Sequence, residues 1–304
     1  MYDTIIIGAG PAGLTAAIYL LRKKIKTLIL TQEIGGQIKD GPLMENFPGF
    51  EKISGPEWIA KVKLQVEKLG AEIKTNQRVE KIIPEDNHFT IICENKDQFS
   101  SKTVLIAAGK CPLKLNVPGE DKFQGKGISH CVTCDAPLFQ DKTVAVIGGG
   151  NSAIIATLEL KKYAAKVYLI NLGENLIGEE VRIDEIKNSP EIEVIAQAKT
   201  LEILGTNLVE KLKLKDLKSN QEKEIEVQGI FIEIGWQPST GFLAGTINLS
   251  GKKEIIIDEN NATNVKGIFA AGDATTVIYK QAIIAAGEGA KAALAVSEYL
   301  SKLT

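Results

Sequence analysis

The pattern of apolar and glycine positions repeats once along the chain. In each copy, a short apolar run is followed by a glycine-rich turn, a mostly apolar segment of helical length and a second apolar run. Gly8 and Gly148 lie 140 residues apart, and so do Gly10 and Gly150. Strand, tight turn, helix and strand in this order are typical of one half of a Rossmann domain. The predicted elements are residues 4–7, 8–13, 14–21 and 26–30 in the first copy, and residues 143–147, 148–153, 154–163 and 166–170 in the second.

The segments that precede and follow the second copy in the sequence supply further elements to the first copy. We therefore predict an α/β fold with two Rossmann-like nucleotide-binding domains of the three-layer ββα type, the second inserted into the first. The expected boundaries are residues 1–113 with 246–304 for one domain, and residues 114–245 for the other. The additional predicted elements are a helix at 56–69, strands at 72–74, 89–93, 103–108 and 267–273, and an alanine-rich helix at 281–300.

The glycine turns indicate dinucleotide binding. The first glycine permits the turn, the second lets the backbone approach a pyrophosphate, and the third lets the helix pack closely on the strand. The N-terminus of the helix then offers free N–H groups and the positive end of its dipole. One such turn alone is weak evidence, but two in matching context point to nucleotide chemistry. In the first copy the predicted binding residues are Gly8, Gly10, Pro11, Ala12 and Gly13.

The tip of the second strand of each copy is where the ribose of a dinucleotide is recognised. An acidic residue there suits a free 2′-hydroxyl, whereas Arg suits a 2′-phosphate. In the first copy Thr31 or Glu33 could contact the ribose. In the second copy the tip begins at Asn171, and no Lys or Arg occurs between Lys166 and Arg182. A 2′-phosphate would lack a cationic partner, so NADP(H) is poorly supported.

Composition and charge narrow the classes of protein. The chain has 304 residues, is 44% hydrophobic and has a net charge of −2, which is typical of a globular α/β protein and gives no case for nucleic acid. No apolar run is long enough to span a membrane, and no basic, apolar leader precedes the first strand, so we expect a cytoplasmic protein. The basic runs at Lys161-Lys162 and at residues 211–218 are most typical of solvated faces.

A CxxC pair supplies redox chemistry. Cys131 and Cys134 can close and reopen a disulfide, and Asp135 follows directly. Together with the nucleotide turns, this pair suggests a flavoprotein that reduces or oxidises disulfides. Half a zinc site is the alternative, but Cys93 and Cys111 are isolated in sequence and no His cluster accompanies them, so we expect no metal and two buried, inert thiols.

His130, next to the first cysteine, has two interpretations. A charged imidazole would lower the pKa of the neighbouring thiol or tune proton delivery. Alternatively, His130 is an ordinary polar loop residue, and we favour this second interpretation.

Several motifs fall in the order seen in the low-molecular-weight thioredoxin reductases, which the whole chain resembles. The turn of Gly8 to Gly13 and the segment Cys131 to Asp135 match this family. The other matching segments are Gly35-Gly36-Gln37, Glu45-Asn46-Phe47-Pro48-Gly49, Gly148 to Ala153, Ala271-Gly272-Asp273 and Tyr279-Lys280-Gln281-Ala282.

The resemblance implies a function and a set of roles. Cys134 would face a flavin, Cys131 would attack a protein disulfide, and Asp135 would give and take protons. The partner would be thioredoxin or a thioredoxin-like protein, and the assembly a homodimer. The first domain would bind FAD through Gly8, Gly10, Pro11, Ala12, Gly13, Thr31, Gly35, Gly36, Gln37, Ile38, Asn46, Gly272, Asp273, Lys280, Gln281 and Ala282.

The chain departs from the NADPH-dependent members of that family. They resemble one another in a His-Arg-Arg segment, where this chain has Asn171-Leu172-Gly173, and Ile154-Ile155 stands where acidic residues are usual. This pattern looks like the branch that takes electrons from ferredoxin, so NAD(P)H is doubtful and the order of expected donors is ferredoxin, NADH, NADPH. The alternatives are an NADH- or NADPH-dependent thioredoxin reductase, a flavin dithiol oxidase, and a non-catalytic redox-responsive binding protein.

Overall fold

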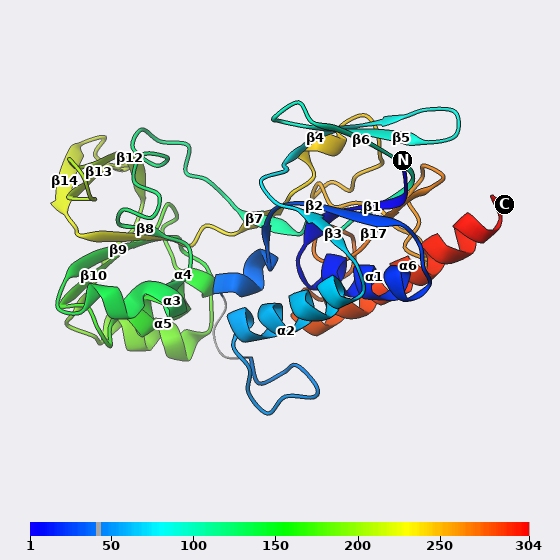
Figure 1. Ribbon diagram of the computed structural model, residues 1–304. Coiled ribbons are helices and arrows are strands. Elements are labelled where there is room, and N and C mark those ends of the chain that lie inside the picture. Colours follow the sequence, from blue (N-terminus) through cyan, green and yellow to red (C-terminus); the bar gives the residue numbers. More distant parts are fainter. Residues whose placement is uncertain (41–43, 304) are drawn as a thin grey trace. The chain divides into compact units, whose positions relative to one another are not determined.

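The chain divides into two compact units (Figure 1). The computed structural model describes residues 1–40 and 44–303, without the side chains of Asp40, Thr133 and Cys134. Unit 1 comprises Met1–Cys111 and Gln237–Thr304, and unit 2 comprises Pro112–Trp236. The sequence had placed the crossings at 113/114 and 245/246. The connecting segments, β7 (Lys110–Pro112) and β16 (Trp236–Pro238), pair as a two-stranded sheet.

Unit 1 is built on a seven-stranded sheet. Its order is β3-β2-β1-β6-β5-β4, and β17 also pairs with β6. The second half of β6 runs parallel to β1 and β17, whereas its first half forms an antiparallel pair with β5. The strands are β1 (Tyr2–Ala9), β2 (Thr27–Ile34), β3 (Glu72–Lys74), β4 (Val79–Pro84), β5 (Phe89–Cys93), β6 (Gln98–Ile106) and β17 (Ile268–Ala270).

The predicted strand at residues 103–108 was wrong at both ends. β6 begins five residues earlier, at Gln98, because its polar first half is a hairpin arm that the apolar pattern does not reveal. It ends at Ile106, and the next residue, Ala107, passes so close to the glycine turn that its carbonyl would lie 2.3 Å from a methyl group on Gly8.

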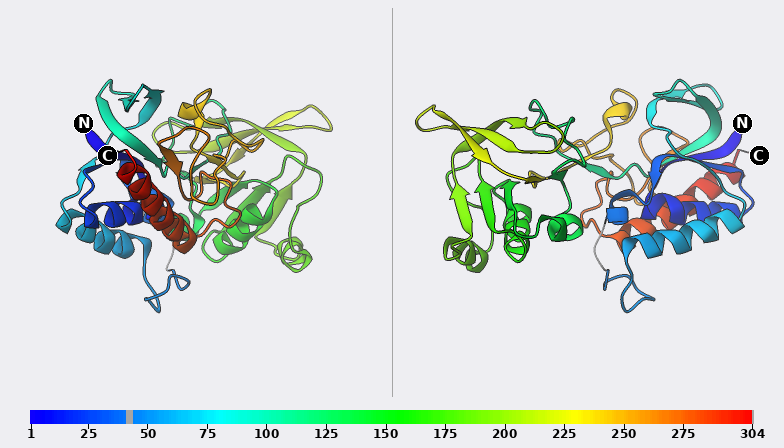
Figure 2. Two further views of the ribbon diagram at one scale, coloured as in Figure 1. Left: turned by 90° about the vertical axis from the view of Figure 1, so that its right-hand side faces the viewer. Right: turned by 60° about the vertical axis from the view of Figure 1, so that its left-hand side comes forward.

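Unit 1 has three layers, as the sequence predicted. The α-helices cover one face of the sheet, where α1 contacts both α2 and α6 (Figure 2). Alternate residues of β1 separate the two cores: Ile6 faces the helices, while Ile5 packs with Ile82 and Ile91 of the β4–β5 hairpin. The helical elements are α1 (Pro11–Arg22), η1 (Gly36–Asp40), α2 (Gly55–Lys68), η3 (Gly241–Leu243) and α6 (Ala282–Ser301).

Unit 2 repeats the layered plan on a parallel sheet of order β11-β10-β9-β15-β8. One face packs against α4 and α5 through Val146 and Leu169, and the other against an antiparallel meander through Ile147 and Ile230. The elements are β8 (Ile128–Ser129), α3 (Val132–Asp135), η2 (Ala136–Phe139), β9 (Thr143–Ile147), α4 (Asn151–Leu160), β10 (Lys166–Ile170), α5 (Glu180–Lys187), β11 (Ile192–Ile195), β12 (Ala198–Leu204), β13 (Lys211–Asp216), β14 (Glu222–Glu226) and β15 (Gly229–Ile232).

The meander explains the basic run at residues 211–218. Along β13, Leu212 and Leu214 point into the core, and the intervening lysines face outward. Lys211 pairs with Glu224 at 3.1 Å and Lys213 with Glu222 at 2.8 Å on the neighbouring strand. The lysines therefore belong to a solvated face of cross-strand ion pairs.

Across residues 1–40 and 44–303, no helix is both long enough and apolar enough to cross a bilayer.

Two glycines of α6 provide a matched test of the helix packing. A methyl group on Gly289 would lie 2.1 Å from the carbonyl oxygen of Ala12 in α1, whereas one on Gly287 would meet nothing within 4 Å. We expect Gly289→Ala to lower the free energy of unfolding by about 1–3 kcal/mol, because α1 and α6 must separate. Gly287→Ala should raise it by about 0.5–1 kcal/mol through helix propensity. Urea unfolding followed by circular dichroism measures both, and equal effects would contradict the packing described here.

Candidate functional site

The glycine turn of unit 1 brings the start of α1 against the end of β1. Gly8 has φ +107°, and a methyl group on Gly13 would lie 1.9 Å from the carbonyl oxygen of Gly8. Only glycine permits this approach. Gly10 is the N-cap residue of α1, and no side chain caps the first N–H groups of this helix. The turn therefore leaves the positive end of α1 open to an anion.

A second glycine pair, after β2, lies against the first turn. Gly35 and Gly36 both have positive φ, and a methyl group on Gly36 would be 3.3 Å from Cα of Gly10. The N–H of Gly35 donates to the carbonyl of Ala9 at 2.8 Å. Thr31, at the end of the buried part of β2, is itself buried. The structure thus brings together two glycine segments that the sequence had assigned to one site.

Glu33 was the other ribose candidate, and its carboxylate already has a partner. Lys39 approaches it at 2.5 Å, on the exposed side of η1. The hydroxyl of Thr31 donates to the carbonyl of Glu33 at 2.6 Å.

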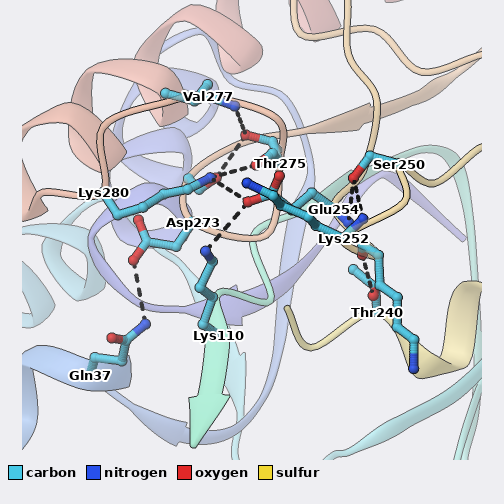
Figure 3. A network of polar contacts seen from close by, with 12 residues as sticks. Gln37, Lys110, Thr240, Ser250, Lys252, Glu254, Asp273, Thr275, Val277 and Lys280 are labelled. Carbon is cyan, nitrogen blue, oxygen red and sulfur yellow. Dashed lines mark hydrogen bonds and ion pairs between the residues drawn. The ribbon is translucent and has the colours of Figure 1, made fainter. Parts of the chain in front are cut away.

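The C-terminal segment adds acceptors from the far end of the sequence. Gly272 follows β17 with φ +77°, and a methyl group there would lie 3.0 Å from Cβ of Ala12. Asp273 receives a hydrogen bond from Gln37 at 3.4 Å (Figure 3). Burial raises the pKa of the Asp273 carboxyl above its ordinary value, although Lys280, Lys110 and Gln37 act in the opposite direction. A hydrogen bond of this length is weak.

The loop before α2 also reaches this region. The amide of Asn46 donates to the side-chain oxygen of Gln281 at 3.1 Å. Gln281 is the N-cap of α6, and Ala282 is its first residue. Four segments from distant parts of the sequence therefore meet at one end of the unit 1 sheet.

Next to Asp273 lies an ion network that the sequence did not reveal. Glu254 is 3.4 Å from Lys110 and 3.3 Å from Lys280, and all three side chains are 16–21% exposed (Figure 3). Lys280 also donates to the carbonyl of Thr275 at 2.6 Å. Burial opposes ionisation of Glu254, but the two ammonium groups outweigh it and hold the pKa of this carboxyl below its ordinary value. Lys110 and Glu254 are 144 residues apart and belong to no motif.

Removing the charge of Glu254 tests this network. Glu254→Gln leaves two half-buried lysines without their anion, so we expect the free energy of unfolding at pH 7 to fall by about 1–3 kcal/mol. Folding lowers the pKa of Glu254. The native chain is therefore more stable than Glu254→Gln at pH values above the ordinary pKa of a carboxyl group, and this difference in the free energy of unfolding is lost as pH falls through the folded pKa. Glu298→Gln, which breaks an exposed pair with Lys302, should lower the free energy of unfolding much less, because solvent screens that pair. Equal losses in urea unfolding would show that the burial contributes nothing.

The cysteine turn, residues 131–135, lies at the carboxyl edge of the unit 2 sheet. β8 ends at Ser129, and Cys131 then caps α3, a short helix that ends at Asp135. The N–H of Cys131 donates to the hydroxyl of Ser129 at 3.0 Å, and the N–H of Asp135 donates to the carbonyl of Cys131 at 3.2 Å. Cys131 is disulfide-bonded. The side chain of Cys134 lies outside the described residues.

The other two cysteines differ from each other. Cys93 is fully buried, and burial together with Asp97 raises the pKa of its thiol to about 11, as an inert thiol requires. Cys111 was also expected to be buried, but it is only half-buried, because it sits in the chain crossing rather than in a core. Among the described residues, no group of three or more His, Cys, Asp or Glu side chains could hold a metal ion.

His130 has partners other than the neighbouring cysteine. Nδ1 lies 3.3 Å from the carbonyl oxygen of Ile232, and Nε2 lies 3.1 Å from the side-chain nitrogen of Gln124. A neutral ring with its proton on Nδ1 donates to the first and accepts from the second. Burial also lowers the pKa of His130, which favours this neutral form. A neutral ring offers no charge to a thiolate, which supports the interpretation of His130 as a polar loop residue.

The second glycine turn opens onto a cavity within unit 2. The cavity measures about 560 Å³ and is lined by residues 147–152, the end of β10 and the segment that follows β15. Asn171 lies at the tip of β10, where Rossmann units commonly carry the acidic residue that binds a ribose. A methyl group on Gly149 would lie 2.1 Å from its Oδ1. Asn171 also accepts from the N–H of Gly173 at 3.1 Å and donates to the carbonyl of Asn175 at 3.0 Å.

The loop after β10 is tied to the glycine turn. The N–H of Ile177 donates to the carbonyl of Gly149 at 2.8 Å. Leu172 and Ile177 are 63% and 78% exposed, so apolar side chains occupy a loop where a 2′-phosphate would need cations.

Comparison with known proteins places the chain in a family. The model for the pyridine nucleotide-disulphide oxidoreductases matches residues 2–289. The F subunit of the alkyl hydroperoxide reductase of Xanthomonas campestris pv. phaseoli is 41% identical over 302 residues, which are 98% of this chain and 57% of that protein. The chain therefore spans less than two thirds of this relative.

Solved structures agree with the sequence match. The thioredoxin reductase of Lactococcus lactis, in its FR conformation, is 34% identical with a TM-score of 0.81, over 99% of this chain and 100% of that one. A ferredoxin-flavin thioredoxin reductase from Clostridium acetobutylicum is 30% identical with a TM-score of 0.56, over 99% and 98%.

The residues of unit 1 fit FAD. The uncapped start of α1 suits a pyrophosphate, and the half-satisfied carboxylate of Asp273 suits a ligand hydroxyl. The glycine segments leave the backbone free of side chains where these groups meet. The chain belongs to the pyridine nucleotide-disulphide oxidoreductase family, whose cofactor is FAD, and it has the fold of the thioredoxin reductases.

Proposed function

We propose that this chain reduces the disulfide of thioredoxin or a thioredoxin-like protein, acting as a homodimer with FAD in unit 1 and the Cys131–Cys134 pair in unit 2. The observation that carries the proposal is the cysteine turn itself. Cys131 is disulfide-bonded and caps a helix that ends at Asp135, at the edge of a parallel sheet where functional residues gather. Family and fold support the same conclusion.

The roles of the residues follow from thiol–disulfide chemistry. When bound, FAD supplies the electron pair that opens the Cys131–Cys134 disulfide. The thiolate of Cys131 attacks one sulfur of the partner, forming a mixed disulfide and releasing the partner's other sulfur. The thiolate of Cys134 then attacks Cys131, which frees the partner as a dithiol and restores the internal disulfide. In each step Asp135 takes the proton of the attacking thiol and passes it to the thiolate that is released.

For the electron donor, we rank ferredoxin first, NADH second and NADPH third. The segment of residues 167–181 offers no cation for a 2′-phosphate, and Asn171 holds the loop there by its own hydrogen bonds. The similarity to a ferredoxin-flavin thioredoxin reductase supports a protein donor. NADH remains second because the glycine turn and its cavity are intact.

Anaerobic mixing distinguishes the donors. Reduced ferredoxin should bleach the visible flavin absorbance of the FAD-loaded protein. NADPH should do so at least about 10²-fold more slowly than in an enzyme with cations for the 2′-phosphate, since each missing charge-assisted hydrogen bond costs ~1.5–3 kcal/mol. Rapid bleaching by micromolar NADPH would refute the ranking.

The dithiol is tested by substitution. Cys131→Ser should abolish reduction of thioredoxin, because no mixed disulfide can form, and Asp135→Asn should slow it by about 10²-fold. His130→Ala should keep the native pH profile of thiol reactivity, since the neutral ring contacts Ile232 and Gln124 rather than Cys131. A Cys131→Ser variant that still turns over thioredoxin would end the proposal.

A second candidate is electron delivery to an alkyl hydroperoxide reductase. The 41% identity to the F subunit of such an enzyme favours it, although this chain matches only part of that protein. Faster turnover with a peroxide-reducing partner than with thioredoxin would select this candidate.

A further inference from the structure

An acidic residue, Glu233, lines the cavity of unit 2, and its backbone packs against the glycine turn. Glu233 directly follows β15, and its N–H donates to the carbonyl of Ile147 at 2.8 Å. Its own carbonyl oxygen would lie 2.3 Å from a methyl group on Gly148. Glu233 lines the same cavity as Asn151 and Ser152, the first residues of α4. This is the helix start at which a Rossmann turn holds a pyrophosphate.

Nothing in the described part of the chain neutralises this carboxylate. No described residue donates a hydrogen bond to it, and burial alone raises the pKa of Glu233 to about 7. Two cations line the cavity: Lys114 pairs with Asp121 at 2.7 Å, and Lys199 is exposed on β12.

Two further ionisable groups lie directly after the neighbouring strand, β8, and in the segment before it. His130 contacts the carbonyl of Ile232 in its neutral form, and Glu120 accepts from the N–H groups of Leu115 and Asn116. Neither supplies a positive charge to Glu233.

A second polar residue of the cavity wall, Thr200, carries a buried hydroxyl group. The side chain of Thr200 is 6% exposed and lines the cavity. Within residues 1–40 and 44–303, its hydroxyl has no hydrogen-bond partner. A buried hydroxyl without a hydrogen-bond partner costs free energy.

We propose that Glu233 determines which ligands enter unit 2: its ionised carboxylate repels a pyrophosphate at the start of α4, so dinucleotides bind there only when Glu233 is protonated. The inference rests on the proposed function, in which electrons at neutral pH come from a protein donor and not from a dinucleotide in this cavity. It identifies a residue that opposes the dinucleotide.

The sign of the pH effect follows from linkage. Above the pKa of Glu233, binding must take up one proton, so affinity for a pyrophosphate ligand falls by up to about tenfold for each pH unit. Below that pKa, affinity is independent of pH. A ligand without phosphate should show little dependence in either range.

The test is calorimetric binding of ADP-ribose to the FAD-loaded protein between pH 5.5 and 8.5. ADP-ribose carries the pyrophosphate without a reducible ring, and its diphosphate diester does not titrate in this range. FAD fills unit 1, and no ferredoxin or disulfide substrate is present, so a failure of the proposed function in turnover assays would leave this measurement interpretable. Adenosine serves as the ligand without phosphate.

We expect the affinity of the native chain for ADP-ribose to fall about tenfold between pH 7.5 and 8.5. Glu233→Gln should retain its low-pH affinity throughout, and so bind about tenfold or more tightly than the native chain at pH 8.5. Glu174→Gln is the matched control, because Glu174 is 66% exposed on the loop after β10 and pairs with Lys218 at 3.7 Å. It should follow the native profile.

Two results would overturn the inference. One is an identical pH profile for the native chain and Glu233→Gln. The other is no binding of ADP-ribose at any pH by either protein, with circular dichroism showing that both are folded, since the cavity would then not be a pyrophosphate site.

Discussion

The structure of each unit depends on a backbone contact between the end of its first strand and the start of the following helix. In unit 1, the carbonyl of Gly8 occupies the space that a side chain on Gly13 would need, so α1 lies directly against the sheet. In unit 2, the corresponding side chain is the methyl group of Ala153, which would be 2.9 Å from a Cβ on Gly148. Both turns leave a helix start without a side-chain cap. The chemistry of each unit is decided by what surrounds that start.

The two surroundings differ in kind. Around α1, other glycines and a half-satisfied carboxylate leave room for FAD, and the ion network of Glu254 holds the C-terminal loop in place. Around α4, Asn171 packs onto Gly149, and Glu233 stands next to Gly148. The geometry of a nucleotide site is thus present in both units, but the side chains at its rim differ.

The sequence was sufficient wherever backbone geometry demands one residue type. The glycine repeat at Gly8 and Gly148 predicted both three-layer units, and the segments around Gly35 and Asp273 do meet those of the first turn. It was insufficient where a contact joins ordinary residues. Lys110 and Glu254 belong to no sequence motif, so their ion pair could not be predicted. Nothing in the sequence distinguishes Glu233 from any other residue that follows an apolar strand. The meander of residues 198–226 was not predicted either, because its charged outer face obscures the apolar alternation of Leu212 and Leu214.

The inserted arrangement also fixes the order in which the two units can be completed on the ribosome. Unit 2 is one continuous stretch, whereas the last strand and the last helix of unit 1, β17 and α6, are synthesised only after it. Until then, the face of α1 that meets α6 and the open side of β6 have no partner. During synthesis, unit 1 therefore exposes apolar surface until β17 and α6 have been made, whereas unit 2 can fold earlier. In this interval we expect unit 1 to be most prone to aggregation and to depend most on chaperones.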